Sequence, residues 1–581
     1  MAKPKVPGIP LSPTRLAAVS LILLGLLLPA RLLLGALRGT LSSALQQDLL
    51  LGALLFKLGL MLLGGAWLVL DRVWGCQRKK EEGRRMKEEE GKSLPSSSFI
   101  LHPLLLALML LVSLGLRLYQ LDSGLWHDEV ITYVNYVSMP LGEIVSTYRD
   151  QNQHFLFSIL ARMAIDTFGA GGWALRLPAV LFGVGSIWAL YLFAAQVTGR
   201  TEALLSAALL AFSYQHVWFS QNARGYSGLL FWALLASWAF VKAQRRADKR
   251  YWLLYSVFCA LGVYTHMSML FMMLGHSASY ALDAVRDPNG RQLKRHADFA
   301  ISLGLTGLFI FQLHALVLPQ ILYHGNEVST VPAWKNPLWA LYEFAAALRI
   351  SFSNGLVIAA GLAVFALGAW DLVKRKRAVI DFLLIPCVAT AAVVVATGHH
   401  LWPRFFFFAF GFMCVVAVRG IFRAVSTTVS LSGIPARTTP FLQVAACLLL
   451  IVFSALSIPH AYVPKQDFLG ALNFVESQIA PGDAVATVGL AGFTYEKLYR
   501  KSWPAVQTLA QLDAIRANSP RTWLVYTFPP EVRAVYPEIM SSVDRDFQTV
   551  RVFPGSVGSG NVFVCRAPSS GEAVVAGWTN R

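Results

Sequence analysis

Long apolar segments separated by short polar links make up most of the first 460 residues. Most segments contain about 17 to 23 residues, the length that an α-helix needs to cross roughly 30 Å of hydrocarbon. The polar pair Thr265-His266 divides one stretch, 251–284, that is too long for a single crossing. About thirteen spanning helices are predicted, at about 15–37, 49–71, 99–119, 175–197, 202–218, 223–243, 251–265, 268–284, 299–320, 356–373, 379–397, 405–425 and 441–458.

Beyond about residue 460 the pattern changes to short apolar runs of strand length. Turn residues such as Pro481-Gly482-Asp483 separate these runs, and stretches of helical spacing lie between them. The expected strands are Ala484–Leu490, Thr522–Phe528, Val550–Phe553 and Val562–Cys565, with helices around 466–479, 491–501 and 530–542. The tail is therefore expected to form a small α/β domain. It contains no nucleophile elbow, P-loop or GxGxxG motif, so we expect it to support substrate selection and not chemistry.

The composition fits a membrane protein. Of 581 residues, 55% are hydrophobic and only 14% are charged, with a mean hydropathy of +0.53. A soluble protein is about a quarter charged. These values exclude a soluble enzyme, a fibrous protein and a disordered chain. The length of the segments excludes an outer-membrane barrel, whose strands alternate in polarity. A polytopic α-helical membrane protein is predicted.

The distribution of basic residues predicts the orientation. The formal net charge is +18, and basic runs occupy four links, at 79–85, 242–250, 291–295 and 374–377. Under the positive-inside rule such runs are cytoplasmic, which places the N-terminus inside and everything after about 459 outside. Nucleic acid is not an expected partner, because a binding face would gather the charge on one folded surface. The absence of Asn-x-Ser/Thr sequons favours a prokaryotic chain, and hence a bacterial inner membrane.

Four units are expected along the chain. Residues 1–71 form a two-helix membrane unit, 72–98 a charged cytoplasmic linker, 99–459 the transmembrane core, and 460–581 the exterior α/β domain. Two stretches of mixed polarity inside the long exterior segment 120–174 predict helices that lie in the interface. The six cysteines show neither a disulfide framework nor a zinc spacing.

Three polar segments lie on the predicted exterior side. The first, Gly124–Val130, carries His127, Asp128 and Glu129. Two adjacent carboxylates at the end of a spanning helix can accept a proton from a nucleophile or bind a cation. The alternative is an interfacial cap, in which Trp126 anchors the chain and Asp128 caps a helix.

The other two segments offer cations. The segment Phe219–Ser227 contains Gln221, Arg224 and Tyr226, and an arginine here can grip a phosphate through two parallel hydrogen bonds or extend to a lipid headgroup. The segment Gly398–Arg404 contains His399, His400 and Arg404, which can bind a phosphate ester. A metal site at the histidine pair lacks a third ligand at a suitable spacing, so no metal is assigned.

The motifs WHDEV, ALRLPAVLFG, YQHVWFSQNARGYS, GVYTHMSMLF and PRFFFFAFG follow one another in this order. Their order, spacing and common exterior side resemble the GT-C superfamily of membrane glycosyltransferases. More narrowly, the chain is similar to glycosyltransferase family 39 and its aminoarabinose-transferase-like branch, which is related to protein O-mannosyltransferases. The likeness covers about residues 99–460. The chain departs from the family at 151–154, where members often have a proline-rich turn, so the acceptor pocket is expected to differ.

The resemblance implies a transferase that takes a sugar from a polyprenyl-phosphate carrier and gives it to an exterior acceptor, which is a protein, a lipid or a glycan. It implies Asp128 as the general base, Glu129 as its support or as a group that orients the acceptor, Arg224 and Tyr226 around the donor phosphate, and Arg404 against the leaving polyprenyl phosphate. Direct displacement would invert the anomeric centre. The remaining expected substrate contacts are His127, Gln221, His399 and His400, together with His154 and His266, which either line the cleft or are structural.

Two other functions compete with this one. A flippase for lipid-linked sugars would place ionisable residues along a path through the membrane, where this chain has few. A non-catalytic scaffold that presents the tail domain would not require Asp128. The resemblance assigns no function to the two N-terminal helices.

Overall fold

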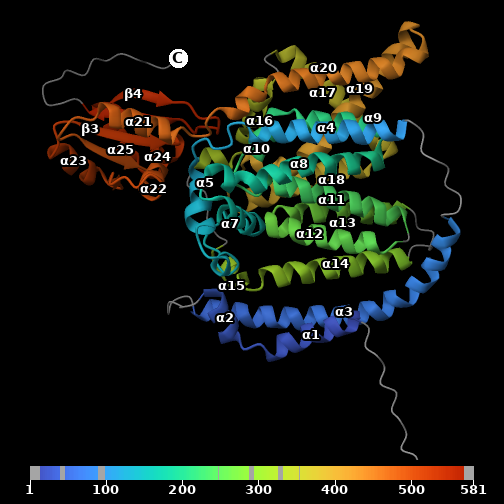
Figure 1. The fold of residues 1–581 in the computed structure, drawn as a ribbon. Coiled ribbons are helices and arrows are strands. Elements are labelled where there is room, and N and C mark those ends of the chain that lie inside the picture. Colours follow the sequence, from blue (N-terminus) through green and yellow to red (C-terminus); the bar gives the residue numbers. More distant parts are fainter. Residues whose placement is uncertain are drawn as a thin grey trace, which may run out of the picture.

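The computed structural model describes residues 13–38, 46–88, 98–246, 248–286, 293–324, 331–351 and 354–567. Figure 1 shows a stack of long, roughly aligned helices, with a small sheet domain at one end. The stack carries apolar side chains on its outside as well as inside, including Leu108, Leu111 and Val388, as expected for helices that face lipid. The predicted fold class, a helical membrane protein with a small C-terminal α/β domain, is confirmed.

The predicted segments all form helices, but fewer than thirteen are long enough to cross a membrane. Of the helices in the described residues, 8 are long and apolar enough, or up to 9 if one bent pair is counted as a span. The rest of the predicted segments form α4, α9 with α10, α12 and α13, which are shorter or more polar. The core helices are α4 (Ser98–Leu118), α8 (Gly172–Val197), α9 (Arg200–Ala211), α10 (Tyr214–Ser220), α11 (Tyr226–Arg245), α12 (Arg250–Thr265), α13 (Met269–Arg286), α14 (Leu293–His314), α17 (Gly355–Arg375), α18 (Ala378–Ala396), α19 (Phe410–Ser432) and α20 (Thr439–Leu456).

The N-terminal helices lie along one side of the stack, at the bottom of Figure 1. The segment predicted at 15–37 is two helices, α1 (Pro13–Leu27) and α2 (Ala30–Arg38), bent by 92°. Pro29 lies at the bend, where it lacks the N–H that would continue the helix. The next helix, α3 (Gln46–Glu88), continues into the predicted linker, of which 89–97 lie outside the described residues.

The N-terminal unit contacts the loop between α6 (Leu141–Ile144) and α7 (Phe155–Phe168) through Arg38, at the end of α2. The Arg38 guanidinium donates to the hydroxyl and carbonyl oxygens of Ser146, both at 2.9 Å, and to the hydroxyl of Thr147 at 2.5 Å. This loop leads to Asn152, which contacts the functional site described below. The N-terminal unit is therefore hydrogen-bonded to the loop between α6 and α7.

Short helices cover the outer ends of the core. They are α5 (His127–Thr132), a π-helical turn at Tyr133–Val137, α6 (Leu141–Ile144), α7 (Phe155–Phe168), α15 (Leu318–His324), α16 (Pro337–Ser351) and a 3₁₀ helix at Pro403–Ala409. Helix α7 buries one face, which includes Phe157 and Ala161, and leaves Met163 and Phe168 exposed. An amphipathic helix of this kind suits the predicted interfacial position.

The C-terminal domain is a five-stranded sheet in the order β2-β1-β3-β5-β4, with β2, β1 and β3 parallel and the other two antiparallel. Side chains alternate across β3, so Trp523 packs with α21 and α22, and Leu524 packs with α24 and α25. The short β2 and helix α23 were not predicted. The elements are α21 (Phe468–Gln478), β1 (Ala484–Val488), α22 (Leu490–Lys497), β2 (Ala505–Val506), α23 (Leu509–Ala517), β3 (Thr522–Thr527), α24 (Pro529–Val535), α25 (Pro537–Asp546), β4 (Gln548–Phe553) and β5 (Val562–Ala567).

The C-terminal domain is fixed to the outer end of the core by polar and aromatic contacts. Gln466 joins the two parts, because it accepts a hydrogen bond from the His127 backbone N–H at 2.9 Å and donates one to Thr527 at 3.0 Å. The Phe528 ring packs in a buried cluster with Trp334 of the core, with ring centroids 6.1 Å apart. The domain therefore lies directly above α5.

Candidate active site

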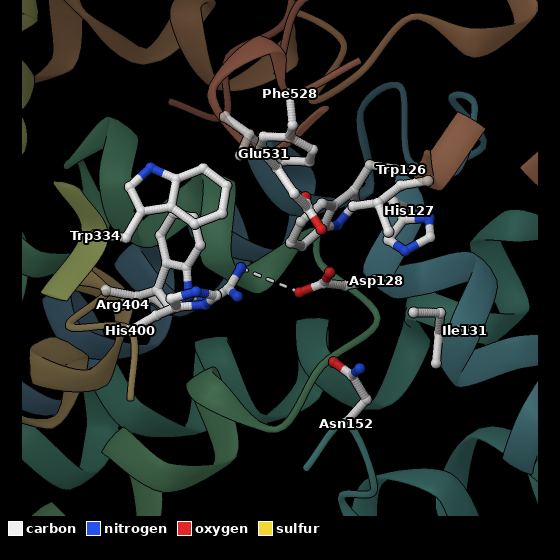
Figure 2. A pocket seen from close by; sticks show the side chains of 13 residues that line it. Trp126, His127, Asp128, Ile131, Asn152, Trp334, His400, Arg404, Phe528 and Glu531 are labelled. Atoms are coloured by element: carbon white, nitrogen blue, oxygen red, sulfur yellow. Dashed lines mark ion pairs between the residues drawn. The ribbon is translucent and has the colours of Figure 1, made fainter. Parts of the chain in front are cut away.

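A cavity of about 180 Å³ lies between the outer ends of the core helices and the C-terminal domain (Figure 2). Both parts of the chain form its walls, so neither contains the whole cavity. The lining residues are Trp126, His127, Asp128, Ile131, Asn152, Trp334, His400, Trp402, Arg404, Leu490, Phe528, Glu531 and Val557. The predicted residues His127, Asp128, His400 and Arg404 therefore share one cavity.

Asp128 lies in the first turn of α5, where the helix N-terminus favours a negative charge. Its Oδ2 atom is 3.1 Å from Nη1 of Arg404 and 4.0 Å from Nη2 of Arg224. The side chain is 13% exposed. Burial alone would raise the pKa of Asp128, but Arg404 and Arg224 outweigh burial and hold the pKa below its ordinary value. The carboxylate is therefore ionised at neutral pH.

Arg224 is held rigidly beside Asp128. Its Nη1 donates to the Asn152 side-chain oxygen at 2.5 Å and to the Thr132 hydroxyl at 3.4 Å, and the side chain is 3% exposed. The turn that carries it requires Gly225, because a Cβ at this position would lie 2.6 Å from the Thr265 carbonyl oxygen. The close packing of the ARGYS turn thus places the Arg224 guanidinium beside the Asp128 carboxylate.

Arg404 occupies the opposite wall and is held by aromatic rings. Its guanidinium carbon lies 4.8 Å from the Trp402 ring centroid and 5.7 Å from that of Trp126. Such contacts attract a cation without using its N–H donors. Arg404 therefore keeps hydrogen-bonding capacity for an anion in the cavity.

The two histidines that line the cavity are neutral at physiological pH. Burial lowers the pKa of His127 to about 4, although Asp128 opposes this shift. Burial also lowers the pKa of His400 to about 4, with Arg404 adding to the effect. Neutral imidazoles leave the two arginines as the cations closest to Asp128 in the described part of the site.

A second group of predicted residues lies behind Arg224 and outside the cavity lining. The rings of His154 and His266 stack with centroids 4.8 Å apart, and Tyr226 lies 5.0 Å from His266. A ring nitrogen of His154 lies 3.1 Å from the Thr265 carbonyl oxygen. Burial lowers the pKa of His266 to about 3, with Arg224 contributing. This neutral aromatic group supports the turn that carries Arg224.

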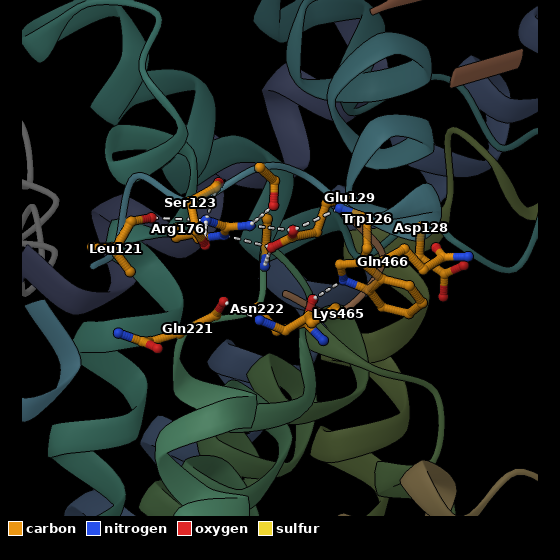
Figure 3. Close-up of polar contacts among 12 residues, drawn as sticks. Leu121, Ser123, Trp126, Asp128, Glu129, Arg176, Gln221, Asn222, Lys465 and Gln466 are labelled. Carbon is orange, nitrogen blue, oxygen red and sulfur yellow. Dashed lines mark hydrogen bonds and ion pairs between the residues drawn. The ribbon is translucent and has the colours of Figure 1, made fainter. Parts of the chain in front are cut away.

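Glu129 is not among the residues that line the cavity, although it is adjacent to Asp128, and Figure 3 shows its side chain directed towards Arg176. It is fully buried and forms an ion pair with Arg176, with Nη2 to Oε2 at 2.5 Å and Nε to Oε1 at 2.8 Å. It also accepts hydrogen bonds from the backbone N–H groups of Ala223 at 2.7 Å and Trp126 at 3.3 Å. Arg176 donates further to carbonyl oxygens at 121–124. The pair therefore joins α5, α8 and the turn before Arg224.

Two more predicted residues do not reach the cavity. The Gln221 side chain donates to the backbone oxygens of Arg117 and Tyr119, at 3.0 and 2.6 Å. His399 is not among the lining residues, although its neighbour His400 is. No group of three or more His, Cys, Asp or Glu side chains in the described residues is arranged to hold a metal ion.

Several residues of the site were not predicted from the sequence. They are Asn152, Arg176, Trp334, Phe528 and Glu531. Arg176 was visible as a charged residue in an apolar segment, which indicates a buried partner. Glu531 follows the carboxyl end of the parallel strand β3, a common place for functional residues in α/β domains.

One region of the chain is similar to a known protein family. Residues 153–314 match the family described as dolichyl-phosphate-mannose-protein mannosyltransferase. A putative mannosyltransferase, YkcB of Bacillus subtilis (strain 168), is 28% identical over 191 residues, which are 32% of this chain and 25% of the relative. The match thus spans a quarter of that relative's length. The resemblance to membrane glycosyltransferases is confirmed for this region, which contains Arg176 and Arg224 but neither Asp128 nor Arg404.

Solved structures show only distant likeness to this chain. ArnT from Cupriavidus metallidurans in the apo state has a TM-score of 0.48 and 11% identity, covering 79% of this chain and 97% of its own. The oligosaccharyltransferase of Archaeoglobus fulgidus tethered with an acceptor peptide has a TM-score of 0.47 and 12% identity, covering 80% of this chain and 74% of its own. At these values neither likeness assigns a substrate or a residue role to this chain.

Proposed function

We propose that this protein is an integral-membrane glycosyltransferase that moves a sugar from a polyprenyl-phosphate donor to an acceptor outside the membrane. The observation that carries the proposal is a carboxylate, Asp128, that faces Arg404 across a cavity at the outer ends of apolar helices, with a second guanidinium, that of Arg224, buried beside the same carboxylate behind the cavity lining. The family match over 153–314 supports a sugar transfer from a lipid phosphate.

The reaction requires a base and a site for a phosphate leaving group. Asp128 removes the proton from the acceptor hydroxyl or amine, and the freed lone pair attacks the anomeric carbon of the sugar. The bond from that carbon to the phosphate oxygen breaks, and its electron pair stays with the phosphate. The leaving phosphate gains one negative charge, which Arg224 and Arg404 stabilise. Direct displacement of this kind inverts the anomeric centre.

In this proposal the two adjacent carboxylates have different roles. Asp128 faces the cavity and reacts, whereas Glu129 is a positioning residue that holds α5 through Arg176. Tyr226, His154 and His266 position Arg224 from behind. His127, His400 and the surrounding tryptophans form neutral walls that restrict water around the reacting groups.

The proposed orientation places the cavity on the exterior face of a bacterial inner membrane. It is supported by the basic links, which all fall on the opposite side from the cavity in the predicted topology. The units proposed are the membrane pair 1–71, the link 72–98, the core 99–459 and the exterior domain 460–581. The acceptor approaches beneath the exterior domain.

The test is sugar transfer from purified undecaprenyl-phosphate sugars, beginning with mannose, in nanodiscs with membrane extract as acceptor. The Asp128→Asn variant is expected to bind the donor but to lose transfer. The matched control is Asp166→Asn, at an exposed carboxylate of α7 that pairs with Arg162. Full transfer by the Asp128→Asn variant would refute the role of this residue. Absence of both donor binding and transfer in the wild type would refute the function, and lipid translocation would then be measured.

A further inference from the structure

A second carboxyl group enters the cavity from the C-terminal domain. Glu531 lies in the first turn of α24 and lines the same cavity as Asp128. Figure 2 shows its side chain reaching from this domain towards Asp128. Within the described part of the chain, no ion pair or hydrogen bond engages its carboxyl group. The carboxyl group of this half-buried residue is therefore available to form a hydrogen bond with a ligand.

The position of Glu531 is fixed by a strained turn. Phe528, at the end of β3, has φ 50° and ψ 63°, in the left-handed region, and is followed by Pro529 and Pro530. A residue before proline normally adopts an extended conformation, so this geometry is strained. Packing of the Phe528 ring against Trp334 maintains it. Strain of this kind is typical of functional turns, and here it directs α24 towards the cavity.

Glu531 is surrounded by groups whose charge is constant near neutral pH. Asp128 on α5 is held ionised by the arginines, and Arg404 on the opposite wall is cationic. His127 and His400 are neutral above pH 5, because the pKa of each lies at about 4. Burial, together with Asp128, raises the pKa of Glu531 to about 7. Of the described residues that line the cavity, Glu531 is thus the group that titrates between pH 6 and pH 8.

We propose that Glu531 completes the part of the site that binds the phosphate of the lipid-linked sugar. When Glu531 is protonated, its carboxyl group donates a hydrogen bond to this phosphate, and when Glu531 is ionised it repels the phosphate. This inference rests on the proposed function and adds a binding residue to it. The cavity, at about 180 Å³, is smaller than the roughly 300–1,000 Å³ of pockets for drug-sized ligands. A phosphate bound at Arg404 therefore lies within reach of Glu531, on the other side of the cavity. Donor binding then requires one proton on Glu531.

The test is the pH dependence of binding of undecaprenyl-phosphate mannose, a phosphodiester with a constant single charge from pH 6 to pH 9. In the wild type the Kd is expected to be about tenfold larger at pH 8 than at pH 6, because the acid form becomes the minor one. The isosteric Glu531→Gln variant cannot ionise. The Kd of this variant is expected to be independent of pH. It should equal the wild-type Kd at pH 6, and at pH 8 it should be about tenfold smaller than the wild-type Kd.

Calorimetry in buffers of different ionisation enthalpy gives a second readout. The wild type is expected to take up close to one proton per donor bound at pH 8, and Glu531→Gln none. The matched control is Glu538→Gln, at an exposed acid of α25 outside the cavity, which should behave as the wild type. Equal thermal midpoints establish that the variants are folded.

Three outcomes overturn the proposal in distinguishable ways. A pH dependence that persists in Glu531→Gln assigns the proton to another group, such as Lys465, whose pKa burial lowers to about 7. A wild-type Kd that does not change with pH excludes a titrating group in the donor site. Failure of the wild type to bind any undecaprenyl-phosphate sugar at any pH refutes the proposed function as well, whereas pH-independent binding leaves that function standing.

Discussion

Replacing Glu129 with glutamine distinguishes the structural carboxylate from the chemical one. Glu129 is fully buried, and both of its oxygens accept hydrogen bonds, two from Arg176 and two from backbone N–H groups. In glutamine an NH2 group replaces one of the two oxygens, and this group would face the N–H groups that now donate to Glu129. The Arg176 charge would then be buried without a counter-charge. Breaking a buried ion pair in this way costs about 3–5 kcal/mol. We expect Glu129→Gln to lose that amount of unfolding free energy.

The assay is titration of the purified protein with SDS in mixed micelles, followed by circular dichroism. The control is Asp128→Asn, a carboxylate of the same turn that opens onto the cavity, for which we expect a smaller loss than for Glu129→Gln, because within the described residues the Asp128 side chain accepts no backbone hydrogen bond. Arg404 also stays in contact with the Trp402 and Trp126 rings. The double variant Glu129→Gln with Arg176→Met should lose less than the sum of the single losses, because no unpaired charge remains. Wild-type stability of Glu129→Gln combined with loss of transfer would refute the reasoning and make Glu129 a reacting group.

Three further results are expected. With saturating donor, the acid limb of the wild-type pH–rate profile should lie below the ordinary carboxylate pKa of about 4, because Arg404 and Arg224 hold the pKa of Asp128 low and the base works when ionised. In Arg404→Gln this acid limb should move to higher pH, and an unchanged limb would contradict the ion pair. Asn152→Ala should weaken donor binding about tenfold or more by releasing Arg224, and an unchanged Kd would argue against this support. Arg38→Met should speed hydrogen exchange in the loop between α6 and α7 but not in the core helices. Exchange equal to that of the wild type would show that the N-terminal unit does not stabilise this loop.

The helices were predictable because apolar length is a local property of the sequence. Each predicted segment is helical in the structure, including the pair on either side of Thr265-His266. Their division into spanning and shorter helices was not predictable in the same way. Helix α9 ends at Ala211 and α10 begins at Tyr214, although the apolar pattern runs through both. Packing against the surrounding helices decides such breaks, and hydropathy does not report packing.

The site was predictable only as a set of candidates. Asp128 and Glu129 are adjacent and chemically alike, so sequence cannot tell which one faces the cavity. The answer depends on Arg176, 47 residues further along the chain. Glu531 lies still further away, and it enters the cavity only because Gln466 and Phe528 fix the C-terminal domain above α5. Contacts between segments that are distant in the chain therefore determine the site, and such contacts cannot be predicted from a single sequence.

In the proposed transfer, the pairing of Asp128 with two arginines has a consequence for the order in which the substrates bind. In the empty cavity the carboxylate is engaged by Arg404 and is therefore a poor proton acceptor. An arriving phosphate competes for the same guanidinium groups and, by loosening their hold, strengthens the base. An acceptor that arrives first meets a base that is still occupied. The geometry thus favours compulsory-order kinetics, in which the lipid donor binds first and the acceptor second.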